Sequence, residues 1–591
     1  MNYILNIFWL LLLLLTVSQS PARAQALVAP SLTDEITQEG TAEMLIILRE
    51  QADLRSAQFF VDKKDKGRWV YDKLIRTAGL TQKDLINKLD MEGLTHRSFH
   101  LVNAILFRGD GQILNWVRAR PEVAAILANP VMQLSRVHRQ TLSPARSVEV
   151  VPWGLELIGV PEVWEAGYTG TGAIVGGQDT GVEWDHPALI DSYRGWDGSA
   201  VDHNYHWHDA IREISLIHND SVIDPSNNPC GLQLIEPCDD AGSSHGTHTM
   251  GTMVGFDSAS SSQVGVAPGA RWIAVRNMER GFGSPASYLE SFEWFLAPTN
   301  LEGLNPDSDR APHVINNSWS CPEFEGCNPE NFTMLEQAIN NLKAAGIMVV
   351  ASAGNAGAGC RTINAPPAIF ENSFTVGSVD VSDSISSFSS RGPVTVDFSF
   401  RIKPNVSAPG RGVVSAIKGG GYGALTGTSM AGPHVAGLVA LMISANPELA
   451  GRVEVIEEII ERTAIEKFEV DTCMDISSRG DFPNALHGFG RIDAFAAVQA
   501  ALQITPLQEI SDNSKVSVYP NPASNYIYFE IAEWVEKISH INIYSSIGQL
   551  VIRQKVNNKI VTSELTALPN GLYFYQFEGG FSHLSGSFVK K

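Results

Sequence analysis

The pattern of apolar and polar positions divides this chain into three regions of different character. From about Val151 to Leu502, short apolar runs alternate with stretches whose apolar residues follow a helical period. We expect strands at Ala173–Gln178, Trp272–Arg276, Val314–Asn317, Ile347–Ser352 and Ser373–Val379, and helices at Pro285–Leu296, Met334–Ala345 and Val453–Thr463. This alternation predicts an α/β fold, a doubly wound and mostly parallel sheet with helices on both faces.

A smaller unit precedes this region and a different one follows it. Residues 26 to about 145 predict a small α+β unit, with strands at Glu43–Glu50, His100–Arg108 and Val123–Leu134 and helices at Leu54–Leu89 and Gln112–Arg120. Residues 503–515 are polar and resemble a linker. Residues 516–591 predict a small all-β sandwich, with strands at Val516–Tyr519, Tyr526–Ile531, Ile541–Tyr544, Leu550–Arg553 and Leu572–Phe577.

The first 24 residues have the composition of a secretory signal peptide. The apolar run Ile4–Val17 is too short to span a bilayer, and Ala22-Arg23-Ala24 offers a cleavage site before Gln25. No Lys or Arg precedes the apolar run, so an uncleaved anchor is the alternative. A net charge of −21 argues against a nucleic-acid partner.

A secreted chain with six cysteines is expected to contain disulfides. The sequence alone leaves many pairings open. Short loops favour Cys230–Cys238 and Cys321–Cys327, which would leave Cys360 with Cys473.

Candidate chemistry centres on Ser429, in the phrase GTSMAGPHVAG at the start of an apolar helix. Free N–H groups and the positive end of the helix dipole point outward there, which suits a nucleophile and the oxyanion it creates. A helix N-cap is the ordinary alternative for such a serine.

Three other polar residues follow apolar segments upstream. Asp179 ends a strand in the phrase DTGV, His245 opens HGTHTMGTMVG, and Asn355 closes VVASAGN. Each alone is more often a turn, cap or core residue. Together with Ser429 they supply a carboxylate, a base, an amide donor and a hydroxyl nucleophile, the set that acyl transfer requires.

The phrases DTG, HGTH, AGN and GTSMAGPHVAG, in this order, resemble the subtilisin-like serine proteases, the subtilases. GVAPGA at Gly265–Ala270, FSSRGP at Phe388–Pro393 and GFGRIDAFAAV at Gly488–Val498 also fit that family. The resemblance implies a subtilisin-like fold in which Asp179, His245 and Ser429 form the catalytic triad and Asn355 contributes to the oxyanion hole. It places His248 and His434 at structural positions.

The same resemblance implies substrate-binding residues. Ser318, Trp319 and Ser320 match the strand that pairs with an extended peptide, although the family usually has Gly where this chain has Ser320. Ser352, Ala353 and Gly354 match the wall of the main specificity pocket. The phrase HNYHWHDAI resembles the bacillopeptidase F branch. Its His203, His206 and His208 have no simple zinc spacing, so an ordered loop is favoured over a metal site.

The flanking regions carry two further resemblances. Residues 43 to about 135 resemble, in position and element order, the subtilase propeptide that inhibits its own enzyme. This resemblance implies a propeptide over residues 25–146 and a catalytic domain over residues 147–502. YPNPASNYIYF, IYSSIGQLV and LPNGLYFYQF within residues 516–591 resemble the C-terminal sorting domain of the type IX secretion system. These resemblances imply export across the outer membrane to the cell surface or the medium.

We therefore expect a secreted serine endopeptidase, made as a preproprotein, that hydrolyses extracellular proteins through an acyl-enzyme. Its expected partners are polypeptide substrates, its own propeptide and the type IX machinery, and we expect a monomer. The resemblance implies no cofactor for catalysis and commonly structural calcium, whose ligands the sequence does not identify. One rival is a surface adhesin on an inactive protease scaffold. Another is nucleotide binding at the Gly-rich Tyr168–Gly177, whose glycines precede the strand instead of following it.

Overall fold

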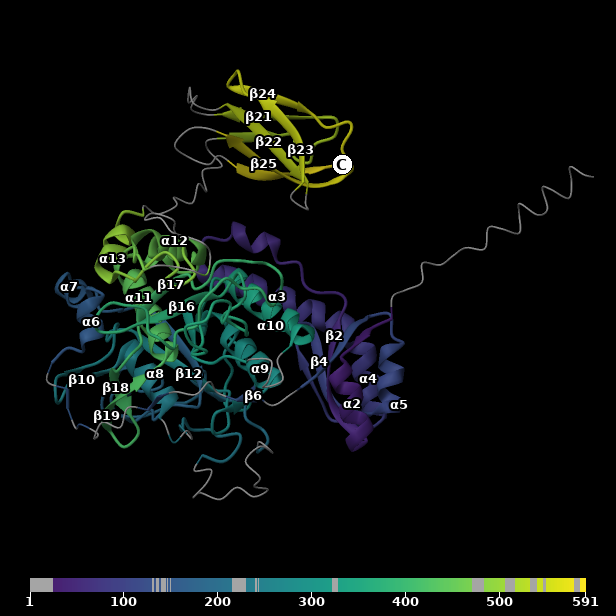
Figure 1. Cartoon of the computed structure of the whole chain (residues 1–591). Coiled ribbons are helices and arrows are strands. Elements are labelled where there is room, and N and C mark those ends of the chain that lie inside the picture. The colour runs from purple at the N-terminus through teal and green to yellow at the C-terminus, as the bar shows by residue number, and fades with distance from the viewer. Residues whose placement is uncertain are drawn as a thin grey trace, which may run out of the picture. The chain divides into compact units, whose positions relative to one another are not determined.

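The computed structural model of the chain (Figure 1) separates into two units, Met1–Ile504 and Thr505–Lys591. It describes residues 25–129, 132–133, 138–139, 145, 147–148, 150–214, 230–239, 242, 244–321, 328–469, 473, 483–504, 516–531, 539–545, 549–578 and 585–591. The predicted signal peptide, residues 1–24, and most of the predicted linker lie outside these residues.

The larger unit is built on a seven-stranded sheet in which every described pair of neighbours is parallel. The strands, in sheet order, are β17 (Val406–Pro409), β16 (Phe374–Val379), β15 (Met348–Ser352), β14 (Val314–Asn317), β8 (Ile174–Asp179), β12 (Arg271–Arg276) and β9 (Trp207–Asp209). The five predicted strands and the α/β fold class are confirmed. The order of strands reverses at β8, and ligands of such sheets gather beyond the carboxyl ends of the strands at that point.

Alternate residues of each strand face opposite sides of the sheet, and each side has its own core. In β14, Val314 belongs to one apolar cluster and Ile315 to the other. The first face is covered by α8 (His245–Val254), α11 (Thr428–Ala445), α12 (Val453–Thr463) and α13 (Ala494–Leu502), and the second by α9 (Pro285–Leu296) and α10 (Pro329–Ala344). The predicted bounds of α9 and α12 are confirmed. Helix α10 begins five residues before the predicted start because Asn328 caps it and Pro329 is its first residue.

Helix α11 is buried on all sides in the interior of this unit. By length and composition it could cross a membrane, but 89% of its apolar window lies inside the protein, as in the core helix of a globular domain.

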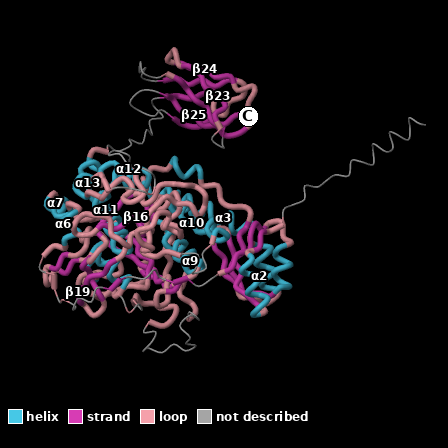
Figure 2. The backbone as a smooth tube through the Cα atoms, viewed as in Figure 1, coloured by secondary structure: helices cyan, strands magenta, loops and turns pink. Residues whose placement is uncertain are grey.

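The N-terminal part of this unit is the expected α+β structure, built on a five-stranded sheet of order β1-β5-β2-β4-β3. Figure 2 shows helices along one side of these strands. The strands are β1 (Leu27–Val28), β2 (Thr41–Leu48), β3 (His96–Phe99), β4 (Ala104–Asp110) and β5 (Val123–Ala128), and the helices are α2 (Pro30–Glu39), α3 (Lys63–Thr81), α4 (Lys83–Met91) and α5 (Gly111–Arg118). Elements β1, α2 and β3 were not predicted.

One face of that sheet packs under α2, α4 and α5, and the other joins α3 and the core around α9 and α10. Leu45, Leu106 and Leu127 of the small sheet belong to the same apolar cluster as Phe292 and Leu335 of those two helices. Residues 25–128 therefore use the side of the seven-stranded sheet that α9 and α10 cover as part of their hydrophobic core.

Shorter elements connect and edge the larger unit. They are β6 (Met132–Gln133), β7 (His138–Arg139), α6 (Trp153–Leu157), α7 (Val160–Glu165), β10 (Phe256–Asp257), β11 (Ser262–Gln263), β13 (Phe282–Gly283), β18 (Val413–Ile417), β19 (Gly421–Thr426) and the 3₁₀ turns Arg55–Phe59, Ile190–Ser192, Ser308–Arg310 and Pro447–Leu449.

The described residues contain two disulfides, Cys230–Cys238 and Cys360–Cys473, which confirms both pairings. Cys321 is also disulfide-bonded, while Cys327, its expected partner, lies outside the described residues.

The second unit consists of two antiparallel sheets that share one apolar core, as expected for a β-sandwich. One sheet contains β20 (Val516–Tyr519), β21 (Tyr526–Ile531) and β24 (Ile560–Glu564). The other contains β22 (His540–Ser545), β23 (Leu550–Lys555), β25 (Gly571–Glu578) and β26 (Ser585–Lys590). Strands β24 and β26 were not predicted.

Candidate active site

A carboxylate and an imidazole meet at the point where the strand order reverses. Asp179 is the last residue of β8, and His245 is the first residue of α8. The Nδ1 atom of His245 lies 2.7 Å from Oδ1 of Asp179, and both side chains are buried. The backbone N–H of Thr180 donates to the same Asp179 oxygen at 2.8 Å. This geometry fixes the orientation of the imidazole and leaves its Nε2 atom directed away from the carboxylate.

The environment of His245 favours its protonated form. Burial lowers the pKa of the imidazole, but the charge of Asp179, the hydrogen bond to it and the charge of Asp239 together raise this pKa above the ordinary value of 6.5. An imidazole in this setting is a stronger base than a free histidine, and its cation is stabilised by the carboxylate.

Ser429 is the second residue of α11, and Gly427 is the N-cap. The N-cap alternative for Ser429 is therefore wrong. The Ser429 hydroxyl donates to the carbonyl oxygen of Ser318 at 3.1 Å. Nε2 of His245 has no hydrogen-bond partner among the residues that the structure describes. The hydroxyl thus bonds to Ser318 here and not to the imidazole.

Pro433 explains the second contact between these two serines. Pro433 lies inside α11 and lacks the N–H that would bond to the carbonyl of Ser429, four residues earlier. The Ser318 hydroxyl donates to that carbonyl instead, at 2.8 Å. Each serine therefore donates its hydroxyl to the other's backbone oxygen, which couples the start of α11 to the end of β14.

The side chain of Asn355 is oriented through its oxygen atom, and the groups that orient it do not bond to its amide nitrogen. Its Oδ1 accepts hydrogen bonds from the N–H of Thr428 at 2.9 Å and from the Thr428 hydroxyl at 3.0 Å. A Cβ atom placed on Gly427 would lie 3.4 Å from Nδ2 of Asn355 and 3.6 Å from the backbone nitrogen of Ser429. The two nitrogens therefore flank one small space beside the hydroxyl-bearing residue, as two donors to an oxyanion must.

The residues matched to substrate binding lie on both sides of the start of α11. Ser352 donates its hydroxyl to the carbonyl of Thr428 at 2.9 Å, and the Gly354 N–H donates to the Thr428 hydroxyl at 3.1 Å. The Trp319 indole is buried and stacks on Tyr288 with ring centroids 3.7 Å apart. The Trp319 side chain is therefore part of the core around α9. Ala353 and Ser320 are buried as well.

Two short strands that follow the N-terminal sheet pair with edges of the catalytic region. Met132–Gln133 of β6 pairs antiparallel with Phe282–Gly283 of β13, just before α9. His138–Arg139 of β7 pairs antiparallel with Leu425–Thr426 of β19. Thr426 lies three residues before Ser429. Met132–Gln133 falls within the predicted extended segment Val123–Leu134, but neither pairing was predicted, because two-residue strands carry no periodic pattern.

The three histidines considered as metal ligands have separate partners. His203 bonds to the Tyr193 hydroxyl at 2.9 Å, His206 to the carbonyl of Asp202 at 3.0 Å, and His208 to Glu290 at 2.9 Å. Among the described residues, no three His, Cys, Asp or Glu side chains gather in a way that could hold a metal ion. The structural calcium that the resemblance implies therefore has no such ligand set in the described part of the chain.

The other two motif histidines are held by backbone carbonyls. His248 bonds to the carbonyl of Val413 at 2.9 Å, and His434 bonds to that of Met430 at 2.8 Å. Burial lowers the pKa of His248 to about 3 and that of His434 to about 4. Both rings are therefore neutral core residues at neutral pH, as the structural positions implied.

A doubly wound sheet, a carboxylate–imidazole pair, a helix-borne serine and an oriented amide define the class of α/β serine hydrolases. The profile of the subtilase family matches residues 170–491, more than half of the chain, and the chain belongs to this family of serine endopeptidases.

The most similar relatives include secreted bacterial proteases. The chain is 32% identical over 513 residues to bacillopeptidase F of Bacillus subtilis (strain 168), which covers 82% of this chain but 33% of that protein. It is 29% identical over 368 residues to subtilisin E of the same strain, covering 62% of this chain and 76% of the relative. It is 30% identical over 335 residues to M-protease of Shouchella clausii (strain KSM-K16), covering 56% and 69%. The chain thus spans about a third of the length of bacillopeptidase F.

The second unit has its own relatives. The profile of the secretion system C-terminal sorting domain matches residues 517–591. This domain marks proteins for type IX secretion, so the protease is exported to the cell surface or the extracellular space.

Proposed function

We propose that Asp179, His245 and Ser429 cleave peptide bonds of extracellular proteins through an acyl-enzyme. The Ser429 hydroxyl leaves the carbonyl of Ser318 by side-chain rotation and donates its proton to Nε2 of His245. Its Oγ atom then forms a bond to the scissile carbonyl carbon. His245 passes the proton to the departing amine as the C–N bond breaks. Water then gives a proton to His245 and bonds to the acyl carbon, and His245 returns that proton to Oγ of Ser429 as the ester C–O bond breaks. The observation that carries this proposal is the buried 2.7 Å contact between His245 and Asp179.

We assign the oxyanion hole to the side-chain amide of Asn355 and the backbone N–H of Ser429. The tetrahedral intermediate carries a full negative charge on the former carbonyl oxygen. Because Thr428 occupies Oδ1 of Asn355 with two donors, the carboxamide is held so that Nδ2 donates into the space beside Gly427. Such a preformed donor lowers the barrier by about 3 to 4 kcal/mol.

Substrates are proposed to bind as extended chains between two backbone edges. Ser318–Ser320 offers one edge, at the end of β14, and Phe282–Gly283 offers the other. The second edge already pairs antiparallel with Met132–Gln133 of the same chain, which is the geometry that a peptide substrate would adopt. Ser352, Ala353 and Gly354 then form the wall of the main side-chain pocket.

Replacing Ser429 with Ala tests this proposal. We expect the variant to lose labelling by a fluorophosphonate probe and casein hydrolysis by a factor of about 10⁵ or more, because the nucleophile is absent. Undiminished hydrolysis would refute the assignment. The same experiment tests the adhesin alternative. Labelling of the parent protein would exclude it, because an inactive protease scaffold does not react with the probe.

Residues 25 to about 133 are proposed to be a propeptide that inhibits the enzyme. Oε2 of Glu293, on α9, accepts the backbone N–H groups of His100 at 2.6 Å and Leu101 at 2.8 Å. Strand β6 pairs with β13, and strand β7 pairs with β19, whose last residue, Thr426, lies three residues before Ser429. We propose that self-cleavage falls between Gln133 and His138, earlier than the boundary at residue 146. In the Ser429→Ala variant this bond stays intact, and sequencing of the mature N-terminus of the parent locates it.

Replacing Glu293 with Ala tests the inhibitory role. The change removes a charged acceptor from two propeptide N–H groups, so we expect the propeptide to dissociate about tenfold faster or more from the processed complex. The lag before peptidase activity appears should shorten, while activity after complete activation should equal that of the parent. Glu302→Ala is a matched control, because Glu302 is an exposed residue in a turn beyond α9. Equal lags in the Glu293 and Glu302 variants contradict the role.

A further inference from the structure

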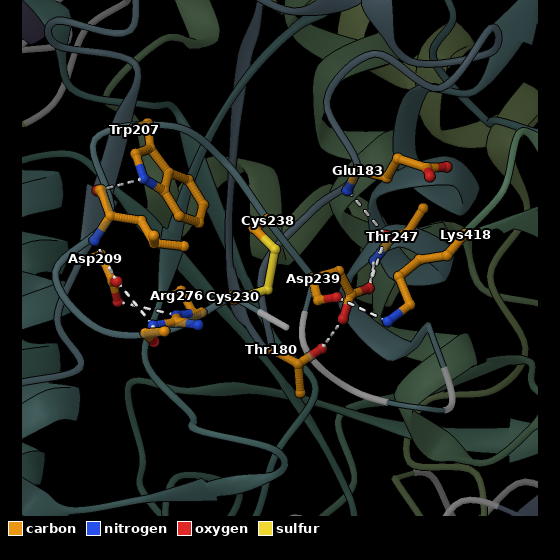
Figure 3. The surroundings of a disulfide bond; sticks show 12 residues. Thr180, Glu183, Trp207, Asp209, Cys230, Cys238, Asp239, Thr247, Arg276 and Lys418 are labelled. Atoms are coloured by element: carbon orange, nitrogen blue, oxygen red, sulfur yellow. Dashed lines mark hydrogen bonds and ion pairs between the residues drawn. A yellow bond between two sulfur atoms is a disulfide. The ribbon is translucent and has the colours of Figure 1, made fainter. Parts of the chain in front are cut away.

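The Cys230–Cys238 disulfide lies between the Asp209–Arg276 pair at the edge of the central sheet and Asp239 with its neighbour Thr247 (Figure 3). The proposed function assigns it no role. At one end of the loop that this disulfide closes, hydrogen bonds and an ion pair hold the chain to the sheet. Hydrogen bonds of Asp239 connect the other end to the segments that carry Asp179 and His245.

One end of the loop is fixed to strands β9 and β12. Arg276 and Asp209 form a buried ion pair at 2.8 Å, and Arg276 also donates to the carbonyl of Gly231 at 2.6 Å. The N–H of Leu234 donates to Asp209 at 2.7 Å, and the Trp207 indole donates to the carbonyl of Leu234 at 3.0 Å. The loop is therefore anchored in the rigid sheet near the first half-cystine.

The other end carries Asp239, which follows the second half-cystine and is buried. Its Oδ1 accepts the hydroxyl of Thr180 at 2.9 Å. Its Oδ2 accepts the hydroxyl of Thr247 at 2.7 Å and the N–H of Thr247 at 3.0 Å. Thr180 is the neighbour of Asp179, and Thr247 is two residues after His245. One carboxylate thus bonds to both segments that carry the candidate acid–base pair (Figure 3).

The three backbone segments leave no room for adjustment. A Cβ atom on Gly181 would lie 1.7 Å from the carbonyl oxygen of Cys238, and one on Gly246 would lie 2.1 Å from the carbonyl oxygen of Gly181. The backbones at 180–181, 238–239 and 246–247 are therefore in direct contact. A displacement of Asp239 would have to move Asp179 relative to His245.

The donors around Asp239 match its ionised form, since both oxygens act as acceptors. Lys418 donates to the backbone carbonyl of Asp239 at 2.8 Å, which places a cation beside the carboxylate. The other charged or titratable groups that face this site are Asp179, His245 and Glu183, whose N–H bonds to the Thr247 hydroxyl at 3.1 Å.

We propose that Asp239 is a positioning residue that holds Asp179 and His245 in register, and that the Cys230–Cys238 disulfide holds Asp239 in place. This inference rests on the proposed triad. A loop specific to the long segment between the first two triad residues would thus be required for full activity, although none of its side chains touches a substrate.

Replacing Asp239 with Asn tests the inference. Enzyme is produced from the full-length chain, active centres are titrated with the fluorophosphonate probe, and kcat and KM on a chromogenic peptide are measured against pH. We expect kcat to fall about tenfold with KM within about twofold of the parent, because the substrate site is untouched. The acid limb of kcat/KM should move to lower pH by about half a unit, because a negative charge near His245 is lost. A purely structural role would not move this limb.

A matched control is Asp257→Asn, which removes a buried carboxylate that accepts the Ala259 N–H and the Ser260 hydroxyl away from the triad. Parental kcat and acid limb in the Asp239 variant would overturn the inference. Should that variant not fold, Thr180→Val decides, since it removes one link to Asp239 and the acceptor of the Gly246 N–H at 3.1 Å and keeps the charge. We expect its kcat to fall several-fold with an unchanged acid limb, and parental kcat would overturn the inference.

The disulfide is tested in parallel. Cys230→Ser/Cys238→Ser should reproduce the loss of kcat seen in the Asp239 variant, while Cys360→Ser/Cys473→Ser, which removes the other described disulfide, should not. Equal kcat in the two double variants would overturn the role of the disulfide. Labelling of the parent separates these outcomes from a failure of the proposed function, because an unlabelled parent would refute the triad itself.

Discussion

At the scale of single residues, hydrogen bonds orient two of the candidate catalytic side chains, while one ring nitrogen has no hydrogen-bond partner among the described residues. Asp179 and the backbone fix the imidazole of His245, and Thr428 fixes the amide of Asn355. Nε2 of His245 has no partner among the described residues, and the Ser429 hydroxyl is engaged elsewhere. The imidazole is oriented by its bond to a buried carboxylate and the amide by two donors, and the hydroxyl that must move is held by one bond.

The pH dependence of the reaction follows from His245. Only the neutral imidazole can accept the proton of Ser429, and the charge and hydrogen bond of Asp179 outweigh burial and raise its pKa above 6.5. We therefore expect kcat/KM to rise with pH through a midpoint above 6.5 and to be lost as the pH falls below it. The check is a pH–rate profile on a peptide without titrating groups. A midpoint below 6.5 would show that burial dominates.

Residue types and their order were sufficient to predict the four candidate site residues. They were not sufficient to predict the neighbouring residues that hold these side chains in position. Asp179, His245, Asn355 and Ser429 stand in phrases whose spacing carries information. Asp239 stands in a polar stretch between a cysteine and a Gly/Ser-rich turn, where an aspartate is ordinarily a turn residue. Its function depends on contacts with Thr180 and Thr247, and nothing in a single sequence reports a contact across 59 positions.

At the scale of elements, the start of α11 illustrates how a helix accommodates a proline. The interior position of Pro433 would leave the buried carbonyl of Ser429 unpaired, and the hydroxyl of Ser318 replaces the missing donor. A hydrogen bond that normally belongs to the helix ladder is thus provided by the neighbouring strand. This ties the nucleophile to the strand proposed to bind substrate.

A double-mutant cycle measures how far the Ser318 hydroxyl replaces the backbone donor that Pro433 lacks. In a His245→Ala background, which prevents self-digestion, Ser318→Ala should lower the free energy of unfolding by about 1 to 3 kcal/mol, because a buried carbonyl loses its donor. Pro433→Ala restores an N–H at that position, so Ser318→Ala should cost less than half as much there. Ser415→Ala is the control, because its buried hydroxyl has no hydrogen-bond partner among the described residues. Equal costs of Ser318→Ala in the two backgrounds would show that no such replacement occurs.

Elements were predicted well where local signals agree with the fold. Helix α9 begins at Pro285 after a Ser284 cap, and both features are visible in the sequence. Strands β9, β24 and β26 were not predicted. Trp207–Asp209 lies in a segment rich in His and Trp, and Ser585–Lys590 is rich in Ser and Gly. Such segments become strands because a neighbouring strand pairs with them, and their own propensity is low.

At the scale of the whole molecule, the two flanking regions differ in whether they share a hydrophobic core with the seven-stranded sheet and its helices. The N-terminal sheet shares an apolar cluster with α9 and α10, so residues 25–128 and the seven-stranded sheet with its helices stabilise each other. The sorting domain has a core of its own and belongs to a separate unit. The region proposed as a propeptide thus depends on the packing of α9 and α10, and the sorting domain contains its own apolar core.

This separation predicts that export and catalysis can be lost independently. A chain that ends at Ile504 keeps every described residue of the first unit, so we expect it to fold, to be labelled by the fluorophosphonate probe and to unfold at the same temperature as the first unit of the full chain. Lacking the domain that marks proteins for type IX secretion, it should remain in the periplasm. The converse control is full-length Ser429→Ala, which should reach the cell surface without activity. Cell fractionation followed by probe labelling distinguishes the two. Surface protein from the truncated chain at the level of the parent would mean that residues 516–591 are dispensable for export, because the catalytic unit would then carry its own signal.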